Sequence, residues 1–198
     1  IILYNTPLIE TDRLILRKFT ENDISALFSI LSDEDVNCYL PWFPLKSLDE
    51  TKAFFQDRYA EVYKQKRGYN YAICLKIDNI PIGYAKISTD DSYDLGYGLK
   101  KEFWHNGIVF EACSAIILQA KKDGIPYITA THDKNNFRSG NVMKRLGMVY
   151  QYSYMEQWQP KDIPVTFRMY QMNFDKSLKF VYKKYWNNSE KHFIETCI

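Results

Sequence analysis

Residues 97–109 read YGLKKEFWHNGIV, and this stretch decides the fold. A strand ends near Leu99, a short loop with the single glycine Gly107 follows, and a helix begins at Ile108. Free backbone N–H groups and the dipole at a helix N-terminus form a site for an anion such as a pyrophosphate. The stretch has neither the G-x-G-x-x-G spacing of a dinucleotide site nor the Gly-Lys-Ser/Thr of a P-loop. Because many such junctions carry a glycine only for the turn, the motif needs support from elsewhere in the chain.

That support comes from residues 135–148, which read NNFRSGNVMKRLGM. Asn136, Ser139, Val142 and Arg145 recur at every third position before Leu-Gly-Met. Asn136 is predicted to cap a helix that a glycine ends. Amphipathic spacing accounts for Val142, but it does not explain why polar Asn and Ser begin a helix directly after a strand.

The whole chain predicts one domain of the α+β class. It has 198 residues, 46% hydrophobic and 25% charged, which supports a sizeable core and argues against bulk disorder. No repeat or linker divides it before about residue 175. The order β-α-α-β-β-β-α-β-α-β-β indicates a mixed sheet covered by helices, without the alternation of a doubly wound fold. The predicted strands are 13–19, 69–77, 81–88, 93–99, 126–131, 148–158 and 165–174, and the predicted helices are 24–31, 47–66, 108–122 and 137–146.

Composition excludes several functional classes. A net charge of +2 is too balanced to indicate a nucleic-acid partner. The four cysteines form no C-x-x-C pair and the three histidines are not spaced as paired ligands, so no metal site is expected. No apolar run approaches the roughly 18–20 residues of a membrane span, so no membrane partner is expected. The first residues lack the pattern of a signal peptide, and a cytoplasmic location is expected.

With these stretches in place, the sequence resembles the GNAT superfamily of acyl-CoA-dependent N-acetyltransferases. The branch is that of the ribosomal-protein N-terminal acetyltransferases and their small-molecule relatives. Three blocks carry the resemblance in family order: ETDRLILR at 10–17, the strand–loop–helix at 95–112, and 136–148. The resemblance implies a GNAT-like acyl-CoA N-acyltransferase fold, with a central mixed, mostly antiparallel sheet flanked by helices. The acetyltransferase domain is expected at residues 1–174, followed by a C-terminal helical extension at 175–198.

The resemblance also implies that acetyl-CoA is a co-substrate. The family loop pattern Arg/Gln-x-x-Gly-x-Gly/Ala, whose amides hold the pyrophosphate, falls on Trp104, His105, Asn106, Gly107, Ile108 and Val109. Gly107 matches, Trp104 stands for the basic or amide residue, and Val109 replaces the small residue and is expected to narrow the groove. The backbone of Tyr97 and Leu99, on a strand splayed by a bulge, is expected to pair with the pantetheine arm. Asn136 is expected to orient the cofactor from the other side.

The implied reaction requires a deprotonated amine, donors for the developing oxyanion and a donor for the departing thiolate. Ser139 matches the family position near the sulfur, and it is expected to stabilise the thiolate; a purely structural place in the first helical turn is the alternative. Asp94 stands where the family often has a glutamate and is the candidate base, with a turn or substrate contact as the alternative. His105 and His132 are expected to be non-catalytic, in the phosphate loop and at a strand end.

The expected acceptor is a primary amine, either a peptide N-terminus or a small molecule. Its specificity is expected to lie in residues 39–44 and in the last hairpin. There Tyr150, Tyr152, Tyr154 and Glu156 share one face of a strand by alternation, and this face is either part of the acceptor side or part of the core. The alternative is a non-catalytic acyl-CoA-binding or interaction module on the same fold, which the departures from the loop pattern favour.

Residues 175–198 differ from the rest of the chain. Leu178, Val181, Tyr182 and Tyr185 would share one face of a helix, with lysines beside them. We expect a capping helix on the sheet edge or the contact surface of a homodimer; a basic surface for an acidic partner is the alternative. Nucleic-acid binding by this basic, aromatic segment is the third and most distant interpretation.

Overall fold

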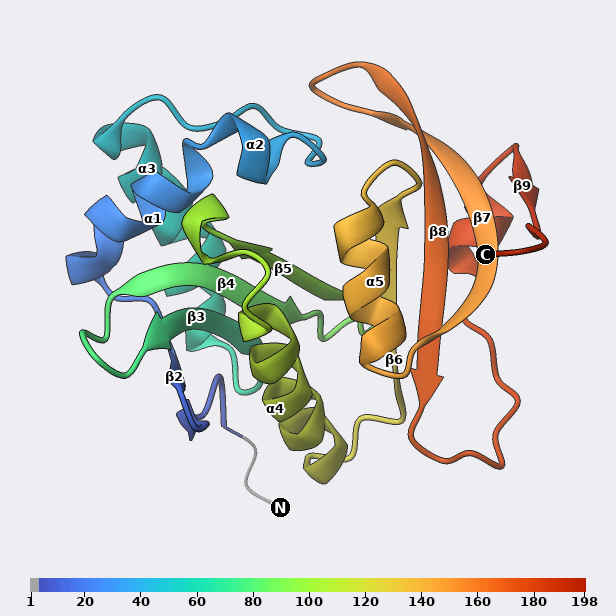
Figure 1. Cartoon of the computed structure of the whole chain (residues 1–198), viewed down its shortest axis with the longest axis horizontal. Coiled ribbons are helices and arrows are strands. Elements are labelled where there is room, and N and C mark those ends of the chain that lie inside the picture. Colours follow the sequence, from blue (N-terminus) through green and yellow to red (C-terminus); the bar gives the residue numbers. More distant parts are fainter. Residues whose placement is uncertain (1–3) are drawn as a thin grey trace.

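The computed structural model describes residues 4–198 and contains two antiparallel sheets that lie side by side (Figure 1). The first sheet has the order β1-β2-β3-β4-β5, and its strands are β1 (Ile9–Glu10), β2 (Leu14–Arg17), β3 (Tyr69–Leu75), β4 (Pro81–Ile87) and β5 (Leu95–Leu99). The second sheet has the order β6-β8-β7-β9, and its strands are β6 (Tyr127–Asp133), β7 (Val149–Trp158), β8 (Ile163–Asn173) and β9 (His192–Phe193). The α+β class and the mostly antiparallel sheet are confirmed.

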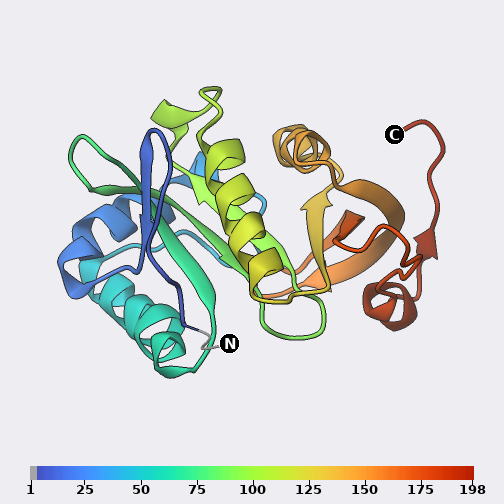
Figure 2. The same cartoon turned by 90° about the horizontal axis from the view of Figure 1, so that it is seen from below.

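Helices cover both sheets, as Figure 2 shows. They are α1 (Ile24–Leu31), α2 (Glu34–Asn37), α3 (Leu48–Phe55), α4 (Ile108–Lys122), α5 (Phe137–Arg145) and α6 (Lys184–Asn188). The main core lies between α4 and one face of the first sheet. A second apolar cluster joins α1 and α3 to the opposite face, around Leu27, Phe55 and Ala72. Burial of both faces fixes the central strands, because exposing either face would return a large apolar area to water.

Local signals in the sequence account for the ends of α4 and α5. Gly124 and Gly147, with φ of 84° and 89°, each follow a helix in the left-handed conformation that glycine adopts without a Cβ clash. The N–H of Ile125 donates to the carbonyl of Ala120, and the N–H of Met148 donates to that of Met143. These are Schellman closures, and they turn the chain sharply from each helix into the following strand.

The two sheets diverge at the centre of the molecule. Asp94, directly before β5, and Thr129 of β6 form a parallel bridge in which the Thr129 N–H donates to the carbonyl of Tyr93 at 3.2 Å. Beyond this bridge β5 and β6 separate. The expected bulge is not present on β5, which pairs with β4 in continuous register from Ile87↔Leu95 to Gly83↔Leu99. The opening therefore comes from the divergence of the two sheets, and the expectation of a bulge was wrong.

The C-terminal segment is not the helical extension that its periodicity predicts. Helix is confined to α6, and β9 then pairs with the edge of β7. Between Leu178 and Tyr182 the backbone bonds to side chains of β8: Gln171 accepts from the Tyr182 N–H at 2.9 Å, and Asn173 donates to the Leu178 carbonyl at 2.8 Å. These bonds replace the i→i−4 bonds of a helix. The segment covers the outer face of the second sheet, where an aromatic cluster includes Tyr182.

Within residues 4–198, no helix combines the length and the apolar composition that crossing a bilayer requires. The same residues contain no group of three His, Cys, Asp or Glu side chains placed to hold a metal ion.

Candidate functional site

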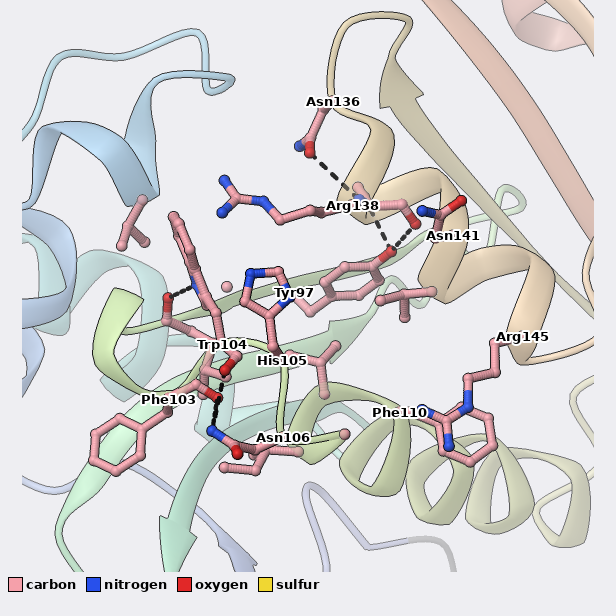
Figure 3. Close-up of a pocket in the computed structure, with 18 of the residues that line it drawn as sticks. Tyr97, Phe103, Trp104, His105, Asn106, Phe110, Asn136, Arg138, Asn141 and Arg145 are labelled. Carbon is pink, nitrogen blue, oxygen red and sulfur yellow. Dashed lines mark hydrogen bonds between the residues drawn. The ribbon is translucent and has the colours of Figure 1, made fainter.

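A groove of about 400 Å³ lies where the two sheets separate (Figure 3). Its walls come from β5, from the loop before α4, from the first turn of α4 and from α5. The nine residues predicted to bind the cofactor all line it: Tyr97, Leu99, Trp104, His105, Asn106, Gly107, Ile108, Val109 and Asn136. Residues up to 39 positions apart in the sequence thus meet in one cavity.

The loop before α4 presents free backbone donors to the groove. His105 and Gly107 adopt left-handed conformations with φ of 64° and 71°, and Gly107 is the N-cap of α4. The first intrahelical bond runs from the Glu111 N–H to the Gly107 carbonyl, so the amides of Ile108, Val109 and Phe110 have no carbonyl partner within the helix. With the helix dipole they form an anion site, which fits the pyrophosphate of the implied cofactor.

Three arginines surround this anion site, and sequence analysis did not assign them a role there. In Figure 3 the guanidinium of Arg138 lies over the ring of Trp104 at 3.4 Å, and that of Arg145 over Phe110 at 4.1 Å. Arg13 donates to the Asn106 carbonyl at 2.9 Å. Their charges complement a phosphate-bearing ligand. For Arg145, the recurrence at every third position from Asn136 was the sequence signal that could have indicated a role at this site.

Contacts within the molecule hold the loop in this shape. The Asn106 side chain donates to the carbonyls of Phe103 and Trp104 at 3.2 and 3.0 Å. Glu111 accepts from Thr11 at 2.6 Å and from Arg13 at 2.8 Å, and these bonds lower the pKa of Glu111. Glu111 therefore ties the N-terminal strand region to α4.

The register of β4 and β5 determines which backbone groups of β5 point toward the groove. The Ser88 N–H donates to the Asp94 carbonyl and the Lys100 N–H to the Ile82 carbonyl, so the alternation directs the backbone groups of Tyr97 and Leu99 away from β4. The Leu99 carbonyl already accepts from the Trp104 indole at 2.8 Å. The Tyr97 amide and carbonyl and the Leu99 N–H are therefore the groups directed to a ligand.

Val109 stands in the wall of the groove without filling it. Its side chain is half-buried and packs partly against the main core, and the groove keeps its volume of about 400 Å³ with Val109 in place.

A second cavity, of about 450 Å³, adjoins the groove. It shares five residues with the groove, namely Val36, Tyr39, Tyr97, Asn136 and Ser139. Residues 39–42, expected on the acceptor side, line this cavity, and so do Trp158 and Phe167 of the last hairpin. A cofactor in the groove and a second molecule in this cavity would therefore meet beside Tyr97 and Ser139.

Ser139 is held by two neighbours. Its N–H donates to the Asn136 side-chain oxygen at 3.3 Å, which is a helix cap. The Tyr97 hydroxyl donates to the Ser139 carbonyl at 2.9 Å and lies 3.0 Å from the Ser139 Oγ. Burial raises the pKa of Tyr97, so its phenol stays protonated. Sequence analysis considered only the backbone of Tyr97 and missed this side-chain contact.

Asp94 lines the second cavity next to the bridge between the sheets. Burial raises the pKa of its carboxyl to about 7, against the opposing influence of the Lys86 charge. Its Oδ1 is buried and has no hydrogen-bond partner among the described residues. A carboxyl that titrates near neutral pH and faces a cavity is typical of a proton acceptor.

The remaining titratable candidates divide between the site and the core. His132 lines the second cavity, and burial lowers its pKa; its Nδ1 lies 2.7 Å from the Asp133 carbonyl. His105 is exposed at the groove. Tyr152 and Tyr154 are buried under the C-terminal segment, where Tyr154 stacks on Tyr185. Of the two alternatives for this face of β7, core or acceptor side, these two residues belong to the core.

Comparison with known proteins agrees with this geometry. The sequence matches the family described as Acetyltransferase (GNAT) domain over residues 13–149. It is 28% identical over 146 residues to YoaA of Bacillus subtilis (strain 168), named as an uncharacterized N-acetyltransferase, which covers 71% of this chain and 82% of that protein. YnaD of the same organism, named in the same way, is 27% identical over 144 residues and covers 71% of this chain and 81% of that protein.

Solved structures share the fold. A RimL ribosomal L7/L12 α-N-protein acetyltransferase in complex with coenzyme A superimposes with a TM-score of 0.75 at 20% identity, over 85% of this chain and 99% of that one. The Microcin C7 self immunity acetyltransferase MccE, in complex with acetyl-CoA and AMP, gives 0.72 at 15% identity, over 82% and 93%. Since the family match spans more than half of the sequence, the chain belongs to the GNAT acetyltransferases and is an acetyl-CoA-dependent acyltransferase.

Proposed function

We propose that this protein transfers the acetyl group of acetyl-CoA to a primary amine by direct attack in a ternary complex. The acceptor is a peptide N-terminus or a small-molecule amine. The observation that carries the proposal is the junction of the two cavities at Tyr97 and Ser139. This arrangement lets a thioester and an amine meet without an acyl-enzyme, and orientation of this kind supplies much of the rate of a bimolecular reaction.

Acetyl-CoA supplies an acetyl thioester, whose carbonyl carbon forms a bond to nitrogen while its bond to sulfur breaks. Ile108, Val109 and Phe110 bind the pyrophosphate through their amides, and Arg138 and Arg145 add positive charge beside it. The Tyr97 amide and the Leu99 N–H bind the pantetheine arm along the free edge of β5 as an added strand would. Donors on this edge also stabilise negative charge on the carbonyl oxygen.

Asp94 accepts the proton that the amine loses. An ammonium has no lone pair, so a base must take this proton before or during attack. The pKa of Asp94, raised to about 7 by burial, keeps a usable fraction ionised at neutral pH and makes it a stronger base than an exposed aspartate. The carboxyl lines the second cavity, where an amine would bind, and its buried Oδ1 has no hydrogen-bond partner among the described residues.

Ser139 donates a hydrogen bond to the departing sulfur. A serine hydroxyl is a poor acid, so it stabilises the thiolate and the sulfur takes its final proton from solvent. Tyr97 positions this hydroxyl: the Tyr97 O–H lies between the Ser139 carbonyl and Ser139 Oγ and donates toward both, which leaves the Ser139 proton for the sulfur.

The test is turnover on a panel of amines, followed by thiol release and by mass spectrometry of the acetylated product. Asp94→Asn and Ser139→Ala should each lower kcat and leave acetyl-CoA binding intact. Asp57→Asn, at an exposed position outside both cavities, is the matched control. Acetyl-CoA binding without turnover on any amine would favour the non-catalytic binding module instead.

A further inference from the structure

The acceptor cavity is bridged on one side by contacts between distant segments. At the tip of the β7–β8 hairpin, the Lys161 ammonium donates to the carbonyls of Asn37 and Cys38, both at 3.3 Å. The Lys161 N–H donates to the Pro41 carbonyl at 3.4 Å. Figure 1 shows this hairpin reaching toward the loop after α2. The bridge and a volume of about 450 Å³ suit a small molecule better than the N-terminal segment of a folded protein.

Two glycines of β5, namely Gly96 in the lining of this cavity and Gly98 in that of the adjoining groove, make room for side chains of β4. A Cβ atom on Gly98 would lie 2.6 Å from the ring of Tyr84, and one on Gly96 would lie 3.3 Å from Lys86 Cε. The missing side chains allow Tyr84 and Lys86, neighbours on β4, to lie across β5. The Gly96-x-Gly98 pattern therefore makes room for a ring and a cation in the lining of the cavity that also contains Asp94.

The walls of the cavity include a group of aromatic side chains. The aromatic side chains that line it are Tyr39, Trp42, Phe54, Tyr59, Tyr84, Trp158 and Phe167. Rings of this number suit an acceptor with an apolar or aromatic body, since burying such a body against them removes apolar area from water.

Two cations line the same cavity without an internal partner. Among residues 4–198, neither the Arg58 side chain nor the exposed Lys86 side chain forms a hydrogen bond or a salt bridge, so both charges are free to contact a ligand. Of the two carboxyl groups in the lining, Asp133 already accepts from the Asn135 N–H at 2.8 Å. Asp94 and Asp133 are the two carboxyl groups that an acceptor amine would meet in this cavity, and further positive charge on the acceptor would face Arg58 and Lys86.

From the bridge, the rings and the unpaired cations, we infer that the acceptor is a small amine with an apolar or aromatic body and an anionic group, as in an α-amino acid. Arg58 and Lys86 bind the anionic group, and Asp94 faces the amine. A polyamine or an aminoglycoside would place additional positive charge beside Arg58 and Lys86, and we expect it to react more slowly. This inference rests on the proposed function, because it names the acceptor of that reaction.

The test compares acceptors that share one body. Phenylalanine carries a carboxylate, 1-amino-2-phenylethylphosphonate carries a phosphonate, and phenylalaninamide and phenethylamine carry no acid; spermidine is the polycation. We expect kcat/KM for at least one acid to exceed that for the amide by about tenfold, the effect of a hydrogen bond to a charged group. The amine of phenylalaninamide is less basic than that of phenylalanine, so a larger fraction of it is unprotonated and able to react. This difference favours the amide and therefore works against the expected result. The two acids separate recognition of a carboxylate from recognition of a phosphate-like group.

Variants locate the effect. The double substitution Arg58→Gln with Lys86→Met should bring the acid-to-amide ratio close to one, while Lys122→Met, at an exposed position on α4, should keep the wild-type ratio. The assays run well above neutral pH, where Asp94 is ionised in every variant, because Lys86 influences its pKa. A ratio near one in the wild type, an unchanged ratio in the double variant, or a preference for spermidine would overturn the inference.

Binding measurements distinguish a failure of the inferred anion site from a failure of the proposed acetyl transfer. Each acid and the amide are titrated into the protein saturated with coenzyme A. Tighter binding of an acid, lost in the double variant, without turnover on any amine would refute the acetyl transfer and retain the anion site. Equal or absent binding of acid and amide would refute the anion site, whether or not other amines are acetylated.

Discussion

Replacing Asp94 by asparagine should stabilise the protein while it removes activity. The Asp94 residue is half-buried, its Oδ1 is buried without a hydrogen-bond partner among the described residues, and its pKa is raised from 3.8 to about 7. Between these two pH values the folded state keeps a proton that the unfolded state has lost. The free energy of unfolding of the wild type therefore falls as pH rises from about 4 to about 7. Asparagine carries no charge and avoids this cost.

The magnitude follows from the pKa difference. A rise from 3.8 to about 7 corresponds to about 4 kcal/mol. Because the residue is partly exposed, solvent screening reduces the expected gain to about 2 kcal/mol. For a chain of this size that gain raises Tm by about 4–8 °C above neutral pH. Near pH 4 the carboxyl is largely protonated in both states, so the two proteins should unfold at similar temperatures.

The assay is thermal unfolding of the wild type and of Asp94→Asn between about pH 4 and pH 8.5, with kcat/KM measured over the range in which both remain folded. The wild-type rate should rise with pH through a midpoint near 7 and fall to about a tenth one pH unit below it. Lys86, Asp90, Tyr97, Tyr154 and Tyr185 are the charged or titratable groups coupled to this carboxyl. Of these, Lys86 lowers its pKa, so Lys86→Met should move the midpoint upward. A less stable Asp94→Asn at alkaline pH, or an unchanged rate, would refute the reasoning.

Ser139→Ala should lower kcat by about ten- to a hundredfold, the loss of one hydrogen bond to a charged sulfur, with KM for acetyl-CoA little changed in steady-state kinetics. Gly140→Ala should lower the stability by about 1–3 kcal/mol in denaturant titrations, because its Cβ would lie 2.7 Å from His132 Nε2; an unchanged midpoint would show that the ring moves freely. Glu195→Gln should lower Tm at neutral pH, because Arg168 holds the pKa of Glu195 near 2. That stabilisation is present above about pH 4.5 and is lost as pH falls through about 2, so a Tm difference that persists at the acid end would contradict this assignment.

The parts of the fold that the sequence predicts are those that depend on interactions between neighbouring residues. The caps at Ser47 and Asn136 and the glycines after α4 and α5 act within a few residues, so the order of strands and helices follows from the sequence. The predicted helix over 47–66 is also present in outline, although α3 passes into a π turn and then a 3-10 turn.

The rest depends on contacts between distant segments. Alternation places Tyr152 and Tyr154 on one face of β7, but only packing of the C-terminal segment determines that this face is buried. The nine predicted cofactor residues lie together because family motifs located them, whereas Arg138 faces Trp104 through a contact that no local pattern encodes. The Lys161 bridge joins residues more than 120 positions apart and has no sequence signal.

The C-terminal segment shows how side chains can override periodicity. Its apolar residues recur at helical spacing. The side chains of Gln171 and Asn173 nevertheless form hydrogen bonds with its backbone, and these bonds take the place of intrahelical ones. A short helix gains little by itself in water, so these bonds to β8 decide the conformation.

The most direct test of the account is calorimetric titration of the purified protein with acetyl-CoA, with NAD as the control ligand. The account predicts one site per chain, with micromolar affinity that weakens when Arg138 and Arg145 are both replaced by glutamine. NAD should give no saturable heat. No binding of acetyl-CoA would contradict the assignment of the groove between β5 and α5 as the coenzyme site.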